Sequence, residues 1–257
     1  MGHKINVIKQ LLKRANPKFK KCINKETIGH KDIKSALIKN QSPTIIFEIG
    51  FGMGMKHWDE IFLELSKTNT VFAYQRNDNK NLKQHITINT LVEDLRVVLS
   101  HKGLKPPYIL VGHSFGGLIV QYFTRKYPNE IQALILVDST HPQEYKDLSI
   151  FSTKMQKQFK HFVLYFNSCG DEILALPSCN KVLVSSLVAT NTEYIKQYPQ
   201  HKQMTEAMLQ KQEVFDTYFP TNQYISMDCG HNIPYEKPDL VIKAIKEVLK
   251  DNQSFAF

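Results

Sequence analysis

Strand-like and helix-like segments alternate along most of this chain, and no other feature of the sequence constrains the fold as strongly. Short apolar or β-branched runs predict strands at 33–39, 44–50, 70–74, 106–112, 131–138, 180–188 and 222–228. Apolar residues at 3–4 spacing predict helices at 57–66, 88–99 and 115–126, and a last helix starting near Pro238. This order predicts an α/β fold with a mostly parallel sheet flanked by helices. Its functional side chains should gather at the carboxyl ends of the strands.

A single α/β domain at residues 33–257 accounts for this pattern. The chain has 257 residues, of which 42% are hydrophobic, enough for one large core, and no Pro/Gly/Ser-rich linker divides it. Residues 1–32 precede the first predicted strand, so we expect a basic N-terminal segment there, either loosely ordered or packed on the core. Residues 141–178 separate two predicted strands and are too long for a simple connection, which predicts a cap or lid.

The expected cap contains a helix with one aromatic face. The apolar positions of this face recur at helical spacing. They are Phe151, Met155, Phe159, Phe162 and Phe166, of which the first four are the lid candidates. One interpretation is a helix packed on the core, and the other is a lid that covers an apolar substrate. Because a lid helix also packs against the body, the two interpretations overlap, and we treat the four residues as candidate substrate or lid residues.

The net charge of +9 is concentrated near the N-terminus. Residues 1–39 hold eleven Lys and Arg against two acidic residues, whereas the rest of the chain is balanced, with 22 of each. Apolar Ile5, Ile8, Leu11 and Leu12 stand at helical spacing within this basic stretch, which suits a weak contact with an anionic membrane surface. The alternative is a solvated terminus. Nucleic-acid binding is not expected, because the stretch carries one aromatic residue, Phe19, and no recognisable motif.

The four cysteines, Cys22, Cys169, Cys179 and Cys229, show no metal-binding spacing. The basic start of the chain has no apolar run or small-residue cleavage site of the kind found in secretory signals. We therefore expect reduced thiols and a cytoplasmic location.

The stretch "VGHSFGG" at 111–117 carries the strongest chemical signal. Its G-x-S-x-G pattern follows a predicted strand and precedes a predicted helix, the context in which a serine nucleophile stands on a sharp turn. Large flanking residues would clash there, which explains Gly112 and Gly116. The N-terminus of the following helix points at Ser114, and a helix N-terminus stabilises negative charge. Ser114 is thus a candidate nucleophile, the alternative being a serine in an ordinary glycine-rich turn.

A serine hydroxyl needs a base, and the order expected for such an elbow is serine, acid, histidine. His57 and His113 precede the serine, while His141 and His231 follow it. His231 comes after the last predicted strand and just before the closing helix, which is the position expected for the base. The alternative for any such loop histidine is a solvated side chain without a role.

The acid would orient the imidazole and stabilise its protonated form. Asp138 ends the predicted strand "ALILVD" at the carboxyl edge of the sheet, and it is the favoured candidate. Glu193, Asp216 and Asp228 remain open as alternatives, and Asp138 could also serve only to cap a turn.

Two backbone N–H groups should form an oxyanion hole. One belongs to Phe115, the residue after the serine. The other is expected in "EIGFGMG" at 48–54, where Phe51 is the best-placed donor. A phosphate-binding loop is the competing interpretation, but neither its lysine nor its glycine spacing is present.

These residues resemble the α/β-hydrolase fold superfamily across roughly 33–250. The stretch "PPYILVGHSFGGLIVQYFTRKYPNEIQALILVDSTHP" at 106–142 resembles the elbow-to-sixth-strand region of esterase-like members. "FEIGFGMG" resembles the oxyanion loop of a subgroup with Glu in place of His, and "CGH" resembles the histidine loop. "VFAYQR" resembles a segment that usually has Tyr-Asp-Arg, from which Gln75 departs. The resemblance implies a triad with Ser114 and His231, an acid after the sixth or seventh strand, and a cap after the sixth strand.

The sequence therefore predicts a serine hydrolase, similar to carboxylesterases and lipases, that cleaves a small-to-medium apolar ester. Ser114 would attack the acyl carbon, His231 would move the proton and Asp138 would orient His231. No cofactor or metal is expected. The alternative keeps the fold without hydrolysis, as a lyase, a perhydrolase or a protein that only binds an apolar ligand.

Overall fold

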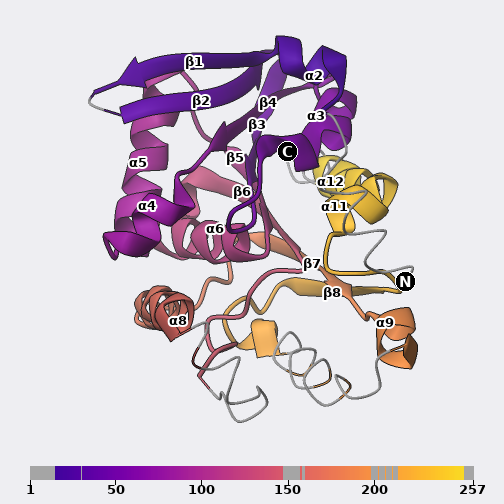
Figure 1. Ribbon diagram of the computed structural model, residues 1–257. Coiled ribbons are helices and arrows are strands. Elements are labelled where there is room, and N and C mark those ends of the chain that lie inside the picture. The colour runs from indigo at the N-terminus through magenta and orange to yellow at the C-terminus, as the bar shows by residue number, and fades with distance from the viewer. Residues whose placement is uncertain are drawn as a thin grey trace.

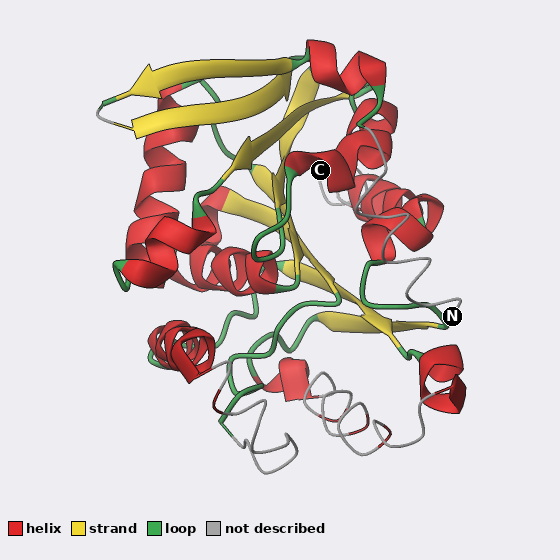
Figure 2. Cartoon of the chain, viewed as in Figure 1, coloured by secondary structure: helices red, strands yellow, loops and turns green. Residues whose placement is uncertain are grey.

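A twisted β-sheet runs through the computed structural model, with helices on both sides (Figures 1 and 2). The structure describes residues 15–29, 31–146, 157, 160–197, 202, 206, 210 and 214–251. Within these residues the sheet has eight strands in the order β1-β2-β4-β3-β5-β6-β7-β8. The strands are β1 (Ile23–Ile28), β2 (Lys31–Ile38), β3 (Gln41–Glu48), β4 (Asn69–Gln75), β5 (Tyr108–His113), β6 (Ile131–Val137), β7 (Leu183–Ala189) and β8 (Asn222–Met227).

The sheet is mostly parallel, as the alternating sequence pattern predicted. Strand β1 pairs with β2 and β2 pairs with β4 in antiparallel fashion, whereas the pairings from β4 through β3, β5, β6 and β7 to β8 are parallel. The carboxyl ends of β3, β5, β6, β7 and β8 therefore meet at one edge of the sheet. All the predicted catalytic residues follow strands that end at this edge.

The described helices cover both faces of the sheet (Figure 1). One face carries α4 (Asp78–Lys83), α5 (Ile88–His101), α6 (Phe115–Lys126) and α8 (Lys160–Leu174). The other carries α2 (Pro17–Lys21), α3 (Asp59–Leu65), α11 (Ile233–Glu236) and α12 (Pro238–Asp251). Short elements complete the described chain, namely η1 (Met55–Trp58), η2 (Pro128–Glu130), α9 (Thr192–Gln197) and η4 (Val214–Thr217).

The core has two halves, one on each face of the sheet. Along β5, Leu110 belongs to the half under α5 and α6, while Ile109 and Val111 belong to the half under α3 and α12. Successive side chains of a strand point to opposite faces, so a strand covered on both sides must be apolar throughout. This explains the uninterrupted runs "YILV" and "ALILV" that marked these strands in the sequence.

We expected the basic N-terminal segment to be either loosely ordered or packed on the core, and its described part, from residue 15 on, packs on the core. Residues 17–28 form α2 and the edge strand β1. Phe19 has 0% exposure and its ring meets that of Phe62 edge-on, with 5.1 Å between centroids. The sequence did not predict β1 because "INKETI" is an edge strand whose polar side chains are mostly exposed. Ile5, Ile8, Leu11 and Leu12, which suggested membrane contact, lie outside the described residues.

The predicted cap region after β6 contains a long helix. This helix, α8, lies between β6 and β7 in the chain and packs on α6 and α5. Phe162, one of the candidate lid residues, belongs to α8 and is partly buried against the core. The other three candidates lie outside the described residues, namely Phe151, Met155 and Phe159.

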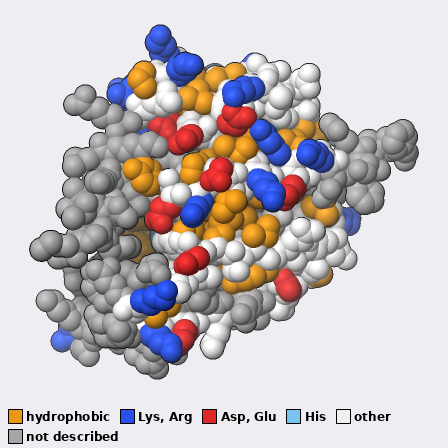
Figure 3. Space-filling model, turned by 90° about the vertical axis from the view of Figure 1, so that its right-hand side faces the viewer, with side chains coloured by type: hydrophobic (Ala, Val, Ile, Leu, Met, Phe, Trp, Pro, Cys, Tyr) orange, Lys and Arg blue, Asp and Glu red, His pale blue; other side chains and the backbone are white. Residues whose placement is uncertain are grey.

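Acidic and basic side chains are interspersed on the face of the molecule that includes α3 and α12 (Figure 3). Lys246 of α12, for example, pairs with Glu64 of α3 at 3.0 Å. This mixture agrees with the balanced charge of the chain after residue 39. Among the described helices, none has both the length and the apolar character that crossing a membrane requires.

Truncation of Phe19 tests whether residues 15–29 are an integral part of the fold. Because Phe19 is fully buried, we expect Phe19→Ala to lower the free energy of unfolding by about 3 kcal/mol. Urea denaturation followed by circular dichroism measures this. The control Lys20→Ala, at an exposed position of the same helix, should change it by less than about 0.5 kcal/mol. Equal stability of the two variants would contradict the assignment.

Candidate active site

Ser114 stands on a sharp turn between β5 and α6. Its backbone angles are φ 53° and ψ −123°, a left-handed conformation that costs a non-glycine residue about 1–3 kcal/mol. Three backbone hydrogen bonds hold it there. The Ser114 N–H donates to the Val137 carbonyl at 3.2 Å, and its own carbonyl accepts from the N–H groups of Gly117 at 2.8 Å and Thr140 at 3.1 Å. The turn is thus fixed from β6 and from its own helix.

The glycines of the elbow leave no room for a side chain. A Cβ atom at Gly112 would lie 2.4 Å from the Val120 side chain and 2.7 Å from the Gly116 carbonyl oxygen. A Cβ atom at Gly116 would lie 2.6 Å from the carbonyl oxygens of Glu48 and Ile49. The prediction that these glycines make room for the turn is therefore confirmed, and the close neighbour of Gly116 is the end of β3.

Asp138 and His231 meet at the carboxyl edge of the sheet. The Nδ1–H of His231 donates to Asp138 Oδ2 at 2.5 Å. Two neighbours on β7 fix the aspartate, since the Ala189 N–H donates to Asp138 Oδ1 at 2.9 Å and the Asp138 N–H donates to the Leu187 carbonyl at 2.7 Å. A backbone φ of 40° at Asp138 turns the chain at this point. The carboxylate bound to His231 is thus the one that ends β6.

The alternative acids have other surroundings. Asp216 in η4 accepts a hydrogen bond from the Asn222 amide at 3.0 Å. Asp228, which follows β8, lies 3.5 Å from a threonine hydroxyl. Glu193 belongs to α9, and its side chain lies outside the part that the structure describes. Of the three described candidates, the structure brings only Asp138 into a hydrogen bond with His231.

The surroundings of His231 raise its pKa above the ordinary 6.5. Burial of the ring acts to lower this pKa, but the hydrogen bond and negative charge of Asp138 outweigh it, helped by the charges of Glu144 and Glu236. The His231 side chain is still 52% exposed, so solvent and a substrate can reach it. The protonated imidazole, the form present after a proton has been accepted, is thereby stabilised.

His113 has a structural role that the sequence analysis did not assign. Its Nε2–H donates to the His231 carbonyl oxygen at 2.8 Å, and the two rings lie 4.8 Å apart between centroids. Burial lowers the pKa of His113 well below 6.5, with further contributions from the charges of His231 and His57, so the ring is neutral. His113 thereby ties the loop that carries His231 to the residue before Ser114.

The two predicted oxyanion donors lie on either side of the serine. Phe115 is the first residue of α6, where an N–H has no acceptor within the helix and the helix dipole favours negative charge. Phe51 follows Gly50, which packs so closely on the elbow that a Cβ atom there would lie 3.3 Å from the Ser114 Cβ. The loop after β3 and the start of α6 thus flank Ser114.

An aromatic cluster packs around the side chains of Phe51 and Phe115. The Phe51 ring packs against Phe115 at 5.7 Å between centroids and against Phe162 at 5.3 Å. Phe166 lies 4.5 Å from Phe115 and 3.9 Å from Phe162, and Tyr145 contacts both α8 phenylalanines. Aromatic rings therefore attach the helix α8 to the Phe51 loop and to the start of α6, both beside Ser114. Phe162 is part of this packing, and a contact between Phe162 and substrate stays a prediction.

Metal-binding side chains do not gather in the described ranges. No group of three or more His, Cys, Asp or Glu residues there could hold a metal ion. The four cysteines are free, with Cys169 and Cys179 buried and Cys22 and Cys229 partly exposed. The absence of a cofactor or metal requirement stays a prediction.

Comparisons with known proteins agree with the fold. A family model described as "alpha/beta hydrolase fold" matches residues 43–226, most of the chain. The chain therefore belongs to the α/β-hydrolase family. The predicted fold class is confirmed: a mostly parallel sheet, flanking helices and a helical insertion after the sixth strand.

Individual relatives are distant. YbdG of Bacillus subtilis is 32% identical over 40% of this chain and 33% of its own length. A human protein named 1-acylglycerol-3-phosphate O-acyltransferase ABHD5 is 30% identical over 54% of this chain and 44% of its own length. The chain thus matches less than half the length of these relatives.

Solved structures support the fold. An epoxide hydrolase of Bacillus megaterium superposes with a TM-score of 0.63 at 16% identity, covering 88% of this chain and all of that chain. Mouse alpha/beta hydrolase domain-containing protein 10 superposes with a TM-score of 0.61 at 15% identity, covering 89% of this chain and 98% of that chain. At such identities the likeness concerns the fold alone.

Loss of the Asp138 charge should lower the pKa of His231. The raised pKa means that protonated His231 stabilises the folded state below its ordinary pKa, a contribution lost as the pH rises through the folded-state value. Asp138→Asn removes the strongest factor that raises this pKa, so it should fall below the wild-type value. NMR titration of labelled histidine rings measures this. Asp228→Asn is the control and should leave the pKa of His231 unchanged, and a wild-type value in Asp138→Asn would refute the assignment.

Proposed function

We propose that this protein is a serine hydrolase that cleaves a carboxylic ester, or a similar acyl bond, through an acyl-enzyme intermediate. The observation that carries the proposal is the hydrogen bond between His231 Nδ1 and Asp138. His113, the residue before Ser114, in turn binds the backbone of the loop that carries His231. The left-handed conformation of Ser114 between β5 and α6 supports it. Membership of the α/β-hydrolase family is compatible with hydrolysis, and the ester and the serine mechanism are our inference from the site.

In this mechanism His231 Nε2 accepts the hydroxyl proton of Ser114 as the serine oxygen forms a bond to the acyl carbon. The carbonyl electron pair moves onto oxygen, where the N–H groups of Phe51 and Phe115 stabilise the negative charge. When the carbonyl re-forms, the bond to the alcohol oxygen breaks and His231 gives its proton to the leaving alcohol. A water molecule then attacks the acyl-enzyme by the same steps, releasing the carboxylic acid and restoring Ser114.

The substrate we propose is a small-to-medium ester with an apolar acyl part. The support is the aromatic cluster that joins α8 to the Phe51 loop and to the start of α6 beside the serine, because apolar surroundings favour apolar ligands. Phe162 belongs to this cluster, and Phe151, Met155 and Phe159 remain candidate lid residues from their sequence spacing alone. A panel of p-nitrophenyl esters of increasing acyl length would define the preferred chain.

An acyl-enzyme can also pass its acyl group to an alcohol in place of water. The name of the human relative, an O-acyltransferase, concerns such a transfer. Adding glycerol derivatives to the ester assay and measuring acylated products would separate the two outcomes. A lyase, a perhydrolase or a non-catalytic binder of an apolar ligand remains the alternative if neither product forms.

The setting of the reaction is also a proposal. We infer a cytoplasmic protein without a cofactor, and the four free cysteines support a reducing compartment. Contact of the basic N-terminal segment with an anionic membrane rests on sequence alone, and we expect no nucleic-acid partner.

A fluorophosphonate probe tests the proposed function directly, since a serine oxygen activated by a base displaces fluoride to form a stable phosphonate ester. We expect the wild-type protein to be labelled and to hydrolyse p-nitrophenyl esters, and Ser114→Ala to do neither. Intact-protein mass spectrometry and gel fluorescence measure the label. A wild-type protein that is neither labelled nor active on any ester of the panel would overturn the proposal.

Substitution of the acid tests the role of Asp138. Asp138→Asn should lower kcat by on the order of 10³-fold or more, because the imidazole loses its orientation and its compensating charge. Asp216→Asn, Asp228→Asn and Glu193→Gln serve as matched controls and should retain kcat within about twofold of wild type. If Glu193→Gln has the larger effect, the acid has been misassigned.

A further inference from the structure

The loop that carries Phe51 is held in place by side chains at the end of β4 and in the three residues that follow it. Three side chains each bind one backbone group of residues 49–53. They are Gln75, whose Nε2 donates to the Met53 carbonyl at 2.9 Å, Arg76, whose Nη2 donates to the Ile49 carbonyl at 2.7 Å, and Asp78, whose Oδ2 accepts from the Gly52 N–H at 2.8 Å. We call Gln75, Arg76 and Asp78 the β4 clamp. The clamp thus binds backbone groups of the loop both before Phe51, at Ile49, and after it, at Gly52 and Met53.

The clamp contains a buried network of charges. The Arg76 side chain is 2% exposed and pairs with Asp78 at 3.0 Å and with the fully buried Glu48. Removing charges from water costs several kcal/mol per ion, so such a network is weak evidence for stability. What it supplies here is geometry, because the fork of a guanidinium fixes the directions of its bonds. Arg76 also lies over the Phe115 ring, 5.6 Å from its centroid. It therefore contacts Phe115, which carries one proposed oxyanion donor, and the loop of Phe51, which carries the other.

The loop needs such support because of its own sequence. Gly50, Gly52 and Gly54 alternate through it, and glycine backbones lose more conformational freedom on folding than any others. Gly52 adopts a φ of +69°, a left-handed conformation natural to glycine, and its N–H is the one that Asp78 binds. Backbone donors stabilise an oxyanion best when they are fixed before the reaction begins.

We propose that Gln75, Arg76 and Asp78 are positioning residues that set the direction of the Phe51 N–H toward the oxyanion formed at Ser114. This inference rests on the function proposed above and extends it to residues that do not touch the substrate. Loss of one hydrogen bond of the clamp should raise the free energy of the transition state, which carries the oxyanion, more than that of the bound ester.

Gln75 gives the proposal a specific chemical test. The segment resembles one that usually has an aspartate at this position, but an ionised carboxylate only accepts hydrogen bonds and has nothing to donate to the Met53 carbonyl. The amide of Gln75 supplies the missing donor. Gln75→Glu keeps the size of the side chain, removes that donor and sets two oxygen atoms against each other.

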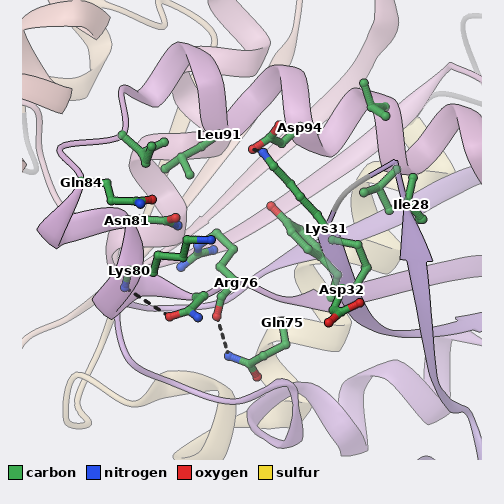
Figure 4. A pocket seen from close by; sticks show the side chains of 16 residues that line it. Ile28, Lys31, Asp32, Gln75, Arg76, Lys80, Asn81, Gln84, Leu91 and Asp94 are labelled. Carbon is green, nitrogen blue, oxygen red and sulfur yellow. Dashed lines mark hydrogen bonds and ion pairs between the residues drawn. The ribbon is translucent and has the colours of Figure 1, made fainter.

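A cavity behind the clamp offers a second test. It has a volume of about 570 Å³, lies between the β1–β2 hairpin and the helices α4 and α5, and is lined by Arg76, Gln75 and Asp32 among others (Figure 4). Lys31 and Asp94 form an ion pair at its side, both of them exposed to solvent. Because Arg76 lines this cavity, the space that truncation of its side chain leaves should open onto it. Guanidinium ions should therefore reach the hole that Arg76→Ala would leave.

The central experiment compares Gln75→Glu and Asp78→Asn with Asp32→Asn. Asp32 lines the same cavity but is exposed and binds the Thr27 hydroxyl instead of the loop, so Asp32→Asn makes the same loss of negative charge as Asp78→Asn without touching the clamp. We expect each clamp variant to lower kcat for p-nitrophenyl esters about tenfold or more, with KM within about twofold. Inhibition by a trifluoromethyl ketone, whose adduct with serine carries an oxyanion, should weaken by the same factor. Asp32→Asn should behave as wild type in both assays.

Two further measurements separate positioning from general loss of structure. Amide hydrogen exchange at residues 50–53 should accelerate in the clamp variants and not in Asp32→Asn. The melting temperature of Gln75→Glu, which keeps the buried ion pairs of Arg76, should stay close to that of the wild type, whereas Asp78→Asn should melt at a lower temperature because it breaks one of them. In Arg76→Ala, guanidinium chloride at millimolar concentration should restore part of kcat. If Arg76→Ala does not fold, the Gln75 and Asp78 variants carry the test.

The possible failures are distinguishable. If fluorophosphonate labels the wild-type protein but both clamp variants keep wild-type kcat and ketone affinity, the positioning role is wrong and the hydrolase function stands. If the wild-type protein is neither labelled nor active, the proposed function fails and the catalytic role of the clamp fails with it. Faster exchange without any loss of kcat would also overturn the positioning role.

Discussion

The first turn of α6 approaches the end of β3 so closely that nothing larger than glycine fits between them. At Gly116 the carbonyl oxygens of Glu48 and Ile49 occupy the space where a Cβ atom would stand. This contact sets how far Ser114 lies from the loop that follows β3, and hence whether one oxyanion can reach donors on both. The strained backbone of Ser114 persists because hydrogen bonds from β6 and from its own helix over-determine it.

Two charged networks then stand on opposite sides of the serine, and their chemistry differs. Asp138 and the half-exposed His231 form a network that can exchange a proton with a substrate, and the raised pKa of His231 favours the charged state needed midway through a reaction. Arg76 with Asp78 and Glu48 forms a buried network, in which the neighbouring acids raise the pKa of the guanidinium despite its burial. Arg76 therefore keeps its charge, and its network can only hold geometry. In the proposed mechanism, the His231 side of the site would transfer protons while the Arg76 side would hold the geometry.

The sequence predicted those features that depend on local order along the chain. The turn at Ser114 and its flanking glycines could be predicted because a strand, a turn and a helix follow one another within one short segment. The edge strand β1 could not, since its run of four polar, mostly exposed residues resembles a loop. The roles of His113 and of the β4 clamp were equally hidden, because they consist of side chains that bind backbone groups far away in the sequence.

The choice among the candidate acids shows where local order stops being informative. The sequence left Asp138 and Glu193 open because both follow strands whose carboxyl ends meet at the same edge. What distinguishes Asp138 is the parallel pairing of β6 with β7, which sets Val137 beside Leu187. That register lets the Leu187 carbonyl and the Ala189 N–H bind Asp138 on two sides, leaving one carboxylate oxygen for His231. An acid held by the backbone of a neighbouring strand needs no local motif, so strand pairing, which only the fold reveals, determines which carboxylate faces the histidine.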